Sequence, residues 1–193
     1  MKTTTLLPAA LALAALNVSA FAKIKTEVVE YHDGDTVCQS FLAYDDASEK
    51  PRPGVLVVQD WTGVGDYVKG RAQQLAEMGY VAFCAVIYGE GVRPTDPKEC
   101  AALSGKYKAD RPVLRQRVRA GLAQLLKSPL VEKSKVAAIG YCFGGTTMLE
   151  LARSGAEVAG VVSSTVGSVH RHPPMRKTSR GRCSPATVQT IRL

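Results

Sequence analysis

The stretch Val136-Ala-Ala-Ile-Gly-Tyr-Cys142-Phe-Gly-Gly145 decides the fold of this 193-residue chain. It begins with an apolar run that is typical of a strand buried on both faces. The glycines that follow allow the backbone to turn sharply into a helix. Strands that lead directly into helices are typical of a parallel sheet covered by helices. We therefore expect an α/β fold with Cys142 at the tip of the turn.

The rest of the chain alternates strands and helices behind an N-terminal hairpin. Apolar runs predict strands at 24–31, 36–44, 55–59, 80–87, 135–139 and 158–162, and helical spacing predicts helices at 67–78, 96–108, 111–126 and 144–153. We expect Asp66 to cap the first helix and Gly79 to end it. This order implies a three-layer sandwich on a mostly parallel sheet, with 158–162 as an exposed apolar edge.

The net charge of +8 is concentrated at the C-terminal end. Residues 164–193 contain no acidic side chain and six basic ones: Arg171, Arg176, Lys177, Arg180, Arg182 and Arg192. This segment has neither aromatic residues nor helical periodicity, so its composition indicates a basic disordered tail. A basic tail could bind phosphates, but we expect no nucleic-acid partner because this one lacks aromatic residues and helical periodicity.

Residues 1–22 have the organisation of a secretory signal peptide. Lys2 supplies positive charge, residues 6–18 form a short apolar run, and Ala20-Phe-Ala22 fits the small-x-small cleavage pattern. Cleavage after Ala22 would leave a periplasmic or secreted protein without a membrane attachment. The alternative is an uncut anchor, although the run is short for a membrane span.

Five cysteines are scattered along the chain without a C-x-x-C pair. They are Cys38, Cys84, Cys100, Cys142 and Cys183. Their spacing matches no zinc site, and we expect neither a metal nor another cofactor. A redox role for Cys142 is an alternative, but no resolving cysteine lies near it in the sequence.

Cys142 occupies the position of a nucleophile at a strand-to-helix elbow. The turn exposes the side chain, the flanking glycines avoid clashes, and the positive end of the helix favours the thiolate. The backbone N–H of Phe143 is one candidate oxyanion donor, and the second is expected from the loop 60–63, at Trp61. The alternative is a buried structural cysteine between glycines that only allow close packing.

Four stretches together resemble the dienelactone hydrolase family of α/β-hydrolases: 55–63, 72–80, 87–89 and 140–145. The resemblance runs from about Lys23 to Ser163. It implies a truncated α/β-hydrolase domain over 23–163, a three-layer sandwich that is incomplete at the C-terminus. It also implies that Cys142 attacks a small ester or lactone and forms an acyl-enzyme, which water then releases.

The same resemblance assigns two further residues. Asp60 stands where the family has an acidic residue, usually glutamate, that interacts with the resting thiol. Arg93 is the nearest candidate for an arginine that binds a substrate carboxylate, and the alternative is a solvated loop residue. The implied partner is a small ester or lactone, and we expect a monomer.

The acid and base of a catalytic triad are missing from their expected places. This fold orders its triad as nucleophile, acid and histidine, yet no Asp or Glu follows Glu157. His170 and His172 come too soon after the last expected strand, and we expect both, like His32, to be exposed loop or tail residues. We therefore expect little or no turnover, and the alternative is a non-catalytic truncated product or a small-carboxylate-binding pseudoenzyme.

The tail resembles the family again when its codons are read from the third base. With permissible codons, 163–166 then encode Phe-His-Gly, 175–181 encode Asp-Ala-Lys-Asn-Ile-Lys-Gly and 186–192 encode His-Gly-Ala-Asp-Asp-Pro. The last string resembles the family segment that carries the triad aspartate. We hypothesise a frameshift near Ser163, in the gene or its sequencing. Resequencing codons 160–193 tests this hypothesis, and codons that do not permit the alternative reading refute it.

Overall fold

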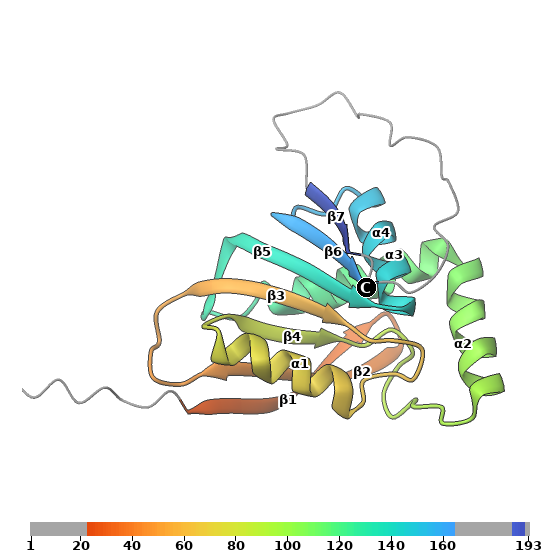
Figure 1. Cartoon of the computed structure of the whole chain (residues 1–193), viewed down its shortest axis with the longest axis horizontal. Coiled ribbons are helices and arrows are strands. Elements are labelled where there is room, and N and C mark those ends of the chain that lie inside the picture. The colour runs from red at the N-terminus through yellow and green to blue at the C-terminus, as the bar shows by residue number, and fades with distance from the viewer. Residues whose placement is uncertain (1–22, 165–186, 192–193) are drawn as a thin grey trace, which may run out of the picture.

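A computed structural model describes residues 23–164 and 187–191 as an α/β sandwich (Figure 1). The sheet has seven strands in the order β1-β2-β4-β3-β5-β6-β7. The β1–β2 and β2–β4 pairs are antiparallel, and all the other neighbours are parallel. The expected α/β class and mostly parallel sheet are therefore confirmed. The predicted signal peptide lies outside the described residues.

The element bounds follow the predicted alternation of strands and helices. The strands are β1 (Ile24–Asp33), β2 (Thr36–Asp45), β3 (Arg52–Val58), β4 (Val81–Ala85), β5 (Val131–Tyr141), β6 (Gly160–Ser164) and β7 (Thr187–Ile191). The helices are α1 (Asp66–Glu77), α2 (Pro97–Ala109), α3 (Arg111–Leu125) and α4 (Phe143–Arg153). Among the described residues, a search for candidate membrane-spanning helices finds none.

Helix α1 begins at Asp66, one residue earlier than predicted. Gly65 is the N-cap and Asp66 is already helical, so the prediction that Asp66 caps the helix is wrong. In the first turn its carboxylate instead complements the positive end of the helix dipole. Gly79 ends the helix as predicted, with φ of +89°. The N–H of Tyr80 donates to the carbonyl of Leu75 at 3.1 Å, which completes a Schellman-type stop.

Helices cover both faces of the sheet and create two core layers. Leu56 and Phe83 face α3 and α4, where they pack with Leu122 and Met148. Val57 faces the opposite side, where small residues of α1 allow the helix to approach the sheet. Neighbouring residues of one strand thus serve different layers, because side chains alternate across a strand. This arrangement is the expected three-layer sandwich.

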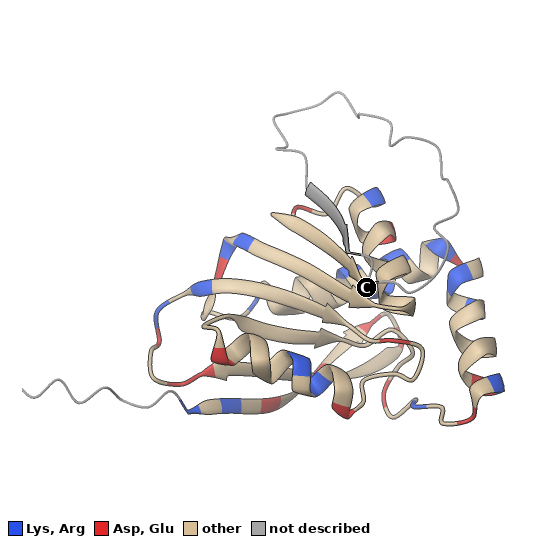
Figure 2. Ribbon diagram, viewed as in Figure 1, with Lys and Arg blue, Asp and Glu red and all other residues tan. Residues whose placement is uncertain are grey.

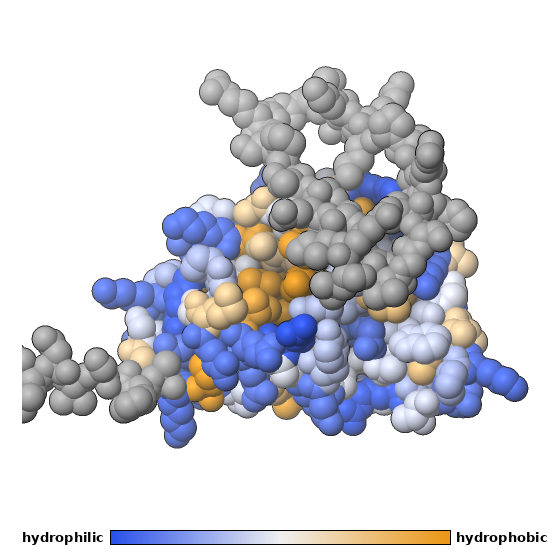
Figure 3. Space-filling model, viewed as in Figure 1, coloured by the Kyte–Doolittle hydropathy of each residue, from blue (hydrophilic) through white to orange (hydrophobic). Residues whose placement is uncertain are grey.

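The layer that contains α1 covers only part of its face of the sheet. Ile139 and Val162 lie in register on β5 and β6 and are only half-buried. Figure 3 shows apolar surface above α1, over this part of the sheet. Within the described residues, the third layer is therefore incomplete over β5 and β6.

The predicted exposed edge at 158–162 is wrong. β6 pairs in parallel with β7 from Gly160 opposite Thr187 to Ser164 opposite Ile191. The sequence 187–191 is rich in β-branched residues, which favour strands, and pairing satisfies the backbone groups that an edge would expose. The predicted disordered tail over 164–193 is wrong at Ser164, which ends β6, and over 187–191, which form β7. Residues 165–186 and 192–193 lie outside the described residues.

Glu150 ties α4 to α3. Its carboxylate is buried and lies 2.7 Å from guanidinium nitrogens of Arg111, Arg115 and Arg153. Burial alone would raise the pKa of Glu150, but hydrogen bonds from Arg153 and Arg115, together with the positive charges of Arg111 and Arg115, outweigh burial and lower it. Figure 2 shows the basic residues of α2 and α3 on this side of the molecule. The cluster fixes the helix that begins directly after Cys142.

A second buried ion pair ties α3 to the N-terminal hairpin. Nη1 of Arg117 lies 3.0 Å from Oδ2 of Asp33, and both side chains are 8% exposed. Nη2 of Arg117 also donates to Oγ1 of Thr36 at 3.0 Å. A buried charge of this kind is tolerated only while its partner is present. The pair therefore holds β1 and β2 against the helical layer.

We expect the substitution Arg117→Met to lower the free energy of unfolding by about 3–5 kcal/mol, because it leaves the Asp33 carboxylate buried without a countercharge. Urea unfolding followed by circular dichroism measures this loss. The matched control is Lys135→Met, which breaks the exposed pair between Lys135 and Glu132 and should change stability by less than about 0.5 kcal/mol. Equal effects of the two substitutions would contradict a structural role for Arg117.

Candidate active site

Cys142 stands at the junction of β5 and α4 in a strained backbone conformation. Its φ is +52° and its ψ is −108°, and it is the only non-glycine residue with positive φ in the described part of the chain. Its N–H donates to the carbonyl of Ser164 at 2.8 Å, so the end of β6 supports the turn. A side chain held at such a turn projects above the sheet. The thiol is exposed, which contradicts the alternative of a buried structural cysteine.

The flanking glycines are required by direct contact between backbones. A Cβ on Gly140 would lie 2.1 Å from the carbonyl oxygen of Gly144. A Cβ on Gly144 would lie 2.5 Å from the carbonyl oxygen of Val58 and 2.6 Å from that of Gln59. These distances are far below van der Waals contact, so only glycine fits at either position. The start of α4 therefore lies directly against the end of β3.

This contact brings the two candidate oxyanion donors to the same edge of the sheet. Phe143 is the first residue of α4, and N–H groups in a first turn have no partner within their own helix. Trp61 lies in the loop after β3, and its side chain is 39% exposed. The elbow and the loop thus adjoin, as an oxyanion hole of this fold requires.

Tyr88 links the elbow to the loop, a role that the sequence analysis did not assign. Its hydroxyl donates to the carbonyl of Trp61 at 3.3 Å. Its ring lies 5.3 Å from the ring of Phe143, centroid to centroid. Burial raises the pKa of Tyr88, and the neighbouring Asp60 carboxylate adds to the rise, so the hydroxyl stays protonated and remains a donor. In the sequence, the stretch 87–89 contains Tyr88 and is part of the family resemblance, but that resemblance assigned the tyrosine no role.

Asp60 lies beside the site, but its carboxylate is occupied locally. Its Oδ1 accepts from the backbone N–H of Thr62 at 2.8 Å and also from the Thr62 hydroxyl. No hydrogen bond joins Asp60 to Cys142 within the described residues. The structure therefore brings Asp60 to the correct edge of the sheet without the expected thiol contact.

Arg93 is exposed and is not grouped with the elbow. A Cβ on Gly63 would lie 3.3 Å from Cγ of Arg93, so the stem of the arginine packs against the end of the loop 60–63. Arg93 lines a cavity together with Gln59 and Lys69, and Cys142 does not line that cavity. Its predicted role toward a substrate carboxylate stays a prediction.

His32 is the one histidine within the described residues, and it does not lie beside the thiol. His32 lies in β1 and not in a loop. It is exposed there and lies opposite Val37 of β2. Four strand spacings separate β1 from β5, which amounts to roughly 19 Å. His170 and His172 lie outside the described residues. No group of His, Cys, Asp and Glu in the described residues could hold a metal ion.

We expect Gly144→Ala to lower the free energy of unfolding by about 1–3 kcal/mol or more, because the added methyl group would overlap two backbone carbonyls. Thermal and urea unfolding measure the change. The matched control is Gly70→Ala in α1, where a Cβ meets no atom within 4 Å. That helix should gain roughly 0.5–1 kcal/mol, and a loss at Gly70 as large as that at Gly144 would refute the contact argument.

Comparisons with known proteins agree with this geometry. Residues 39–181 match the dienelactone hydrolase family, a range that runs past Ser163. The crystal structure of a dienelactone hydrolase-like promiscuous phosphotriesterase from metagenomic libraries is 40% identical with a TM-score of 0.69, and the match covers 72% of this chain and 58% of that one. A structure named m3DLH is 32% identical with a TM-score of 0.76, and the match covers 88% of this chain and 68% of that one. A search of curated proteins gives no match.

The chain spans less than two thirds of the metagenomic enzyme's length. The matched residues nevertheless include the elbow, the loop after β3 and Tyr88. The strained elbow, the sheet order and the family match agree on one conclusion. This chain belongs to the dienelactone hydrolase family.

Proposed function

We propose that Cys142 attacks the carbonyl carbon of a small ester or lactone and forms a thioester with the acyl group. The thiolate sulfur forms the new bond, and the bond from the carbonyl carbon to the leaving alkoxide oxygen breaks. The N–H groups of Phe143 and Trp61 are the proposed donors to the oxyanion between these steps. The observation that carries the proposal is the exposed Cys142 thiol on a strained elbow. The other described cysteines are buried.

The contrast among the cysteines supports this assignment. Burial raises the pKa of the Cys84 thiol to about 12, and burial also raises the pKa of Cys38. Neither thiol is accessible to a substrate, since both side chains are fully buried. Reaction with an electrophile in the described chain is therefore expected at Cys142.

Release of the acyl group needs a base that removes a proton from water. Oδ1 of Asp60 accepts two hydrogen bonds from Thr62, and His32 lies four strand spacings from β5. We therefore propose that this chain acylates faster than it deacylates. The same observations favour a second candidate, a non-catalytic chain, for which we propose small carboxylates as ligands.

The proposed setting follows from the sequence. We propose an exported monomer, periplasmic or secreted, that acts on a small molecule without a cofactor. No nucleic acid or membrane takes part in the proposed reaction.

We expect p-nitrophenyl acetate to release about one equivalent of p-nitrophenol per chain in a burst, followed by a slow phase, because acylation needs no water and deacylation does. Stopped-flow absorbance measures the burst, and mass spectrometry of a digest locates the acetyl group on Cys142. Cys142→Ala should abolish the burst, whereas the matched variant Cys100→Ala, at a buried cysteine, should keep it.

Two outcomes would contradict parts of the proposal. A burst of equal size in Cys142→Ala would remove the assignment of the nucleophile. Sustained release of many equivalents by the unmodified chain would show that a base is present. Absence of any acyl adduct would leave the non-catalytic candidate.

A further inference from the structure

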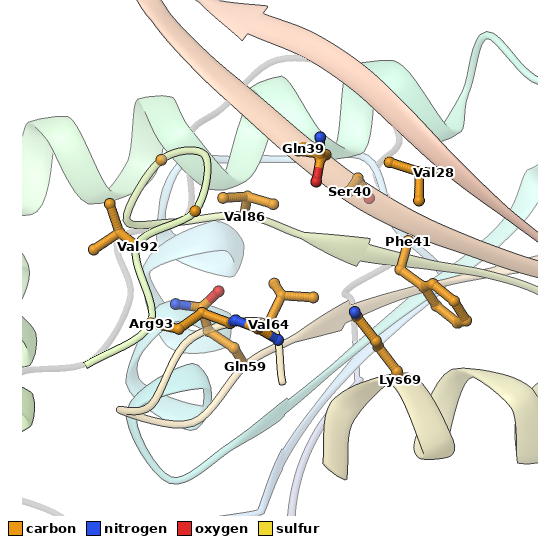
Figure 4. Close-up of a pocket in the computed structure, with 12 residues that line it drawn as sticks. Val28, Gln39, Ser40, Phe41, Gln59, Val64, Lys69, Val86, Val92 and Arg93 are labelled. Atoms are coloured by element: carbon orange, nitrogen blue, oxygen red, sulfur yellow. The ribbon is translucent and has the colours of Figure 1, made fainter. Parts of the chain in front are cut away.

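A cavity of about 180 Å³ lies where β4 leaves the sheet, between β2 and the loop that follows β3 (Figure 4). It is lined by residues of β1, β2, α1 and the segments after β3 and β4, among them Gln39, Ser40, Gln59, Lys69 and Arg93. Cys142 and Phe143 are not among its walls. The cavity is therefore separate from the elbow.

Gln59 is the residue in this cavity that needs an explanation. Its side chain is 1% exposed, yet neither its amide oxygen nor its amide nitrogen has a hydrogen-bond partner in the described structure. Buried polar groups in folded proteins are nearly always hydrogen-bonded, because leaving them unpaired costs free energy. Figure 4 shows the amide of Gln59 at the cavity wall. One donor group and one acceptor are thus held at the wall of the cavity.

The charges around the cavity favour an anion. Lys69 of α1 and Arg93 both line it. The nearby carboxylate of Glu90 accepts from Nε2 of Gln39 at 3.0 Å. Ser40 is buried and donates its hydroxyl hydrogen to the carbonyl of Cys84 at 2.6 Å, so only its lone pairs remain for a ligand. The two cations outnumber the single carboxylate, which already accepts a hydrogen bond from Gln39. The net charge around the cavity is therefore positive.

We propose that this cavity binds a small hydroxycarboxylate. The carboxylate accepts from Nε2 of Gln59 and pairs with Lys69, while the hydroxyl donates to Oε1 of Gln59. An amine could also donate to Oε1, but two nearby cations disfavour a further positive charge. A volume of about 180 Å³ leaves room for a compound of lactate's size. The proposal rests on Gln59 and Lys69 and does not depend on the reaction proposed for Cys142.

The binding test uses lactate, acetate and propane-1,2-diol with the full chain, measured by calorimetry and by the fluorescence of Trp61, the sole tryptophan of the sequence. Lactate should bind saturably, and acetate and the diol, which each lack one of the two groups, should bind on the order of tenfold more weakly. Gln59→Leu should lose on the order of tenfold or more in lactate affinity, and Lys69→Met several-fold. Cys142→Ala should bind lactate as the unmodified chain does.

Three results would overturn the proposal. They are unchanged lactate affinity in Gln59→Leu, absence of saturable lactate binding by the unmodified chain, and a loss in Cys142→Ala as large as that in Gln59→Leu. Thermal unfolding in the presence of lactate provides a second measurement, because a ligand that binds only the folded state raises its melting temperature. If Gln59→Leu does not fold, Lys69→Met decides: a melting shift equal to that of the unmodified chain refutes the site.

Discussion

Contact between the backbones of β3 and α4 is the constraint on which the rest of this structure depends. Gly144 lies against the carbonyls of Val58 and Gln59, and Gly140 lies against the carbonyl of Gly144. Because no side chain fits between these backbones, α4 must begin immediately after β5. The residue between these glycines, Cys142, then has to adopt positive φ and project from the sheet edge. The close packing of the two glycines against backbone carbonyls therefore determines that the Cys142 side chain is exposed.

The surrounding contacts hold this junction from several directions. Glu150 anchors α4 to the arginines of α3, and Arg117 anchors α3 to the hairpin through Asp33. On the other side, Tyr88 contacts both the Trp61 carbonyl and the ring of Phe143. The elbow thus has rigid support, as a preorganised site needs. His32, the one histidine within the described residues, has no comparable place beside Cys142. Of the two proposed steps, acylation and release, release is the one that needs a base to activate water.

Local patterns predicted the elements of this fold well, because strands, helices and stops depend on neighbouring residues. The positive φ of Gly79 and the buried apolar runs of β3 and β4 are examples. The predictions were wrong where the outcome depended on a distant segment of the chain or on a shift of one residue. Asp66 lies inside the first turn because Gly65 already caps the helix, and β6 is not an edge because β7 pairs with it across a long separation in sequence.

The sequence by itself determined the α/β class, the elbow and the identity of its nucleophile candidate, since these follow from residues that are adjacent along the chain. Only the tertiary structure decided which distant residues meet. It placed His32 four strands from β5, turned Asp60 toward Thr62, and placed Gln59 and Lys69 on the wall of one cavity that Cys142 does not line. Strand order and the packing of loops on the sheet set these distances, and neither can be read from the spacing of residues along the chain.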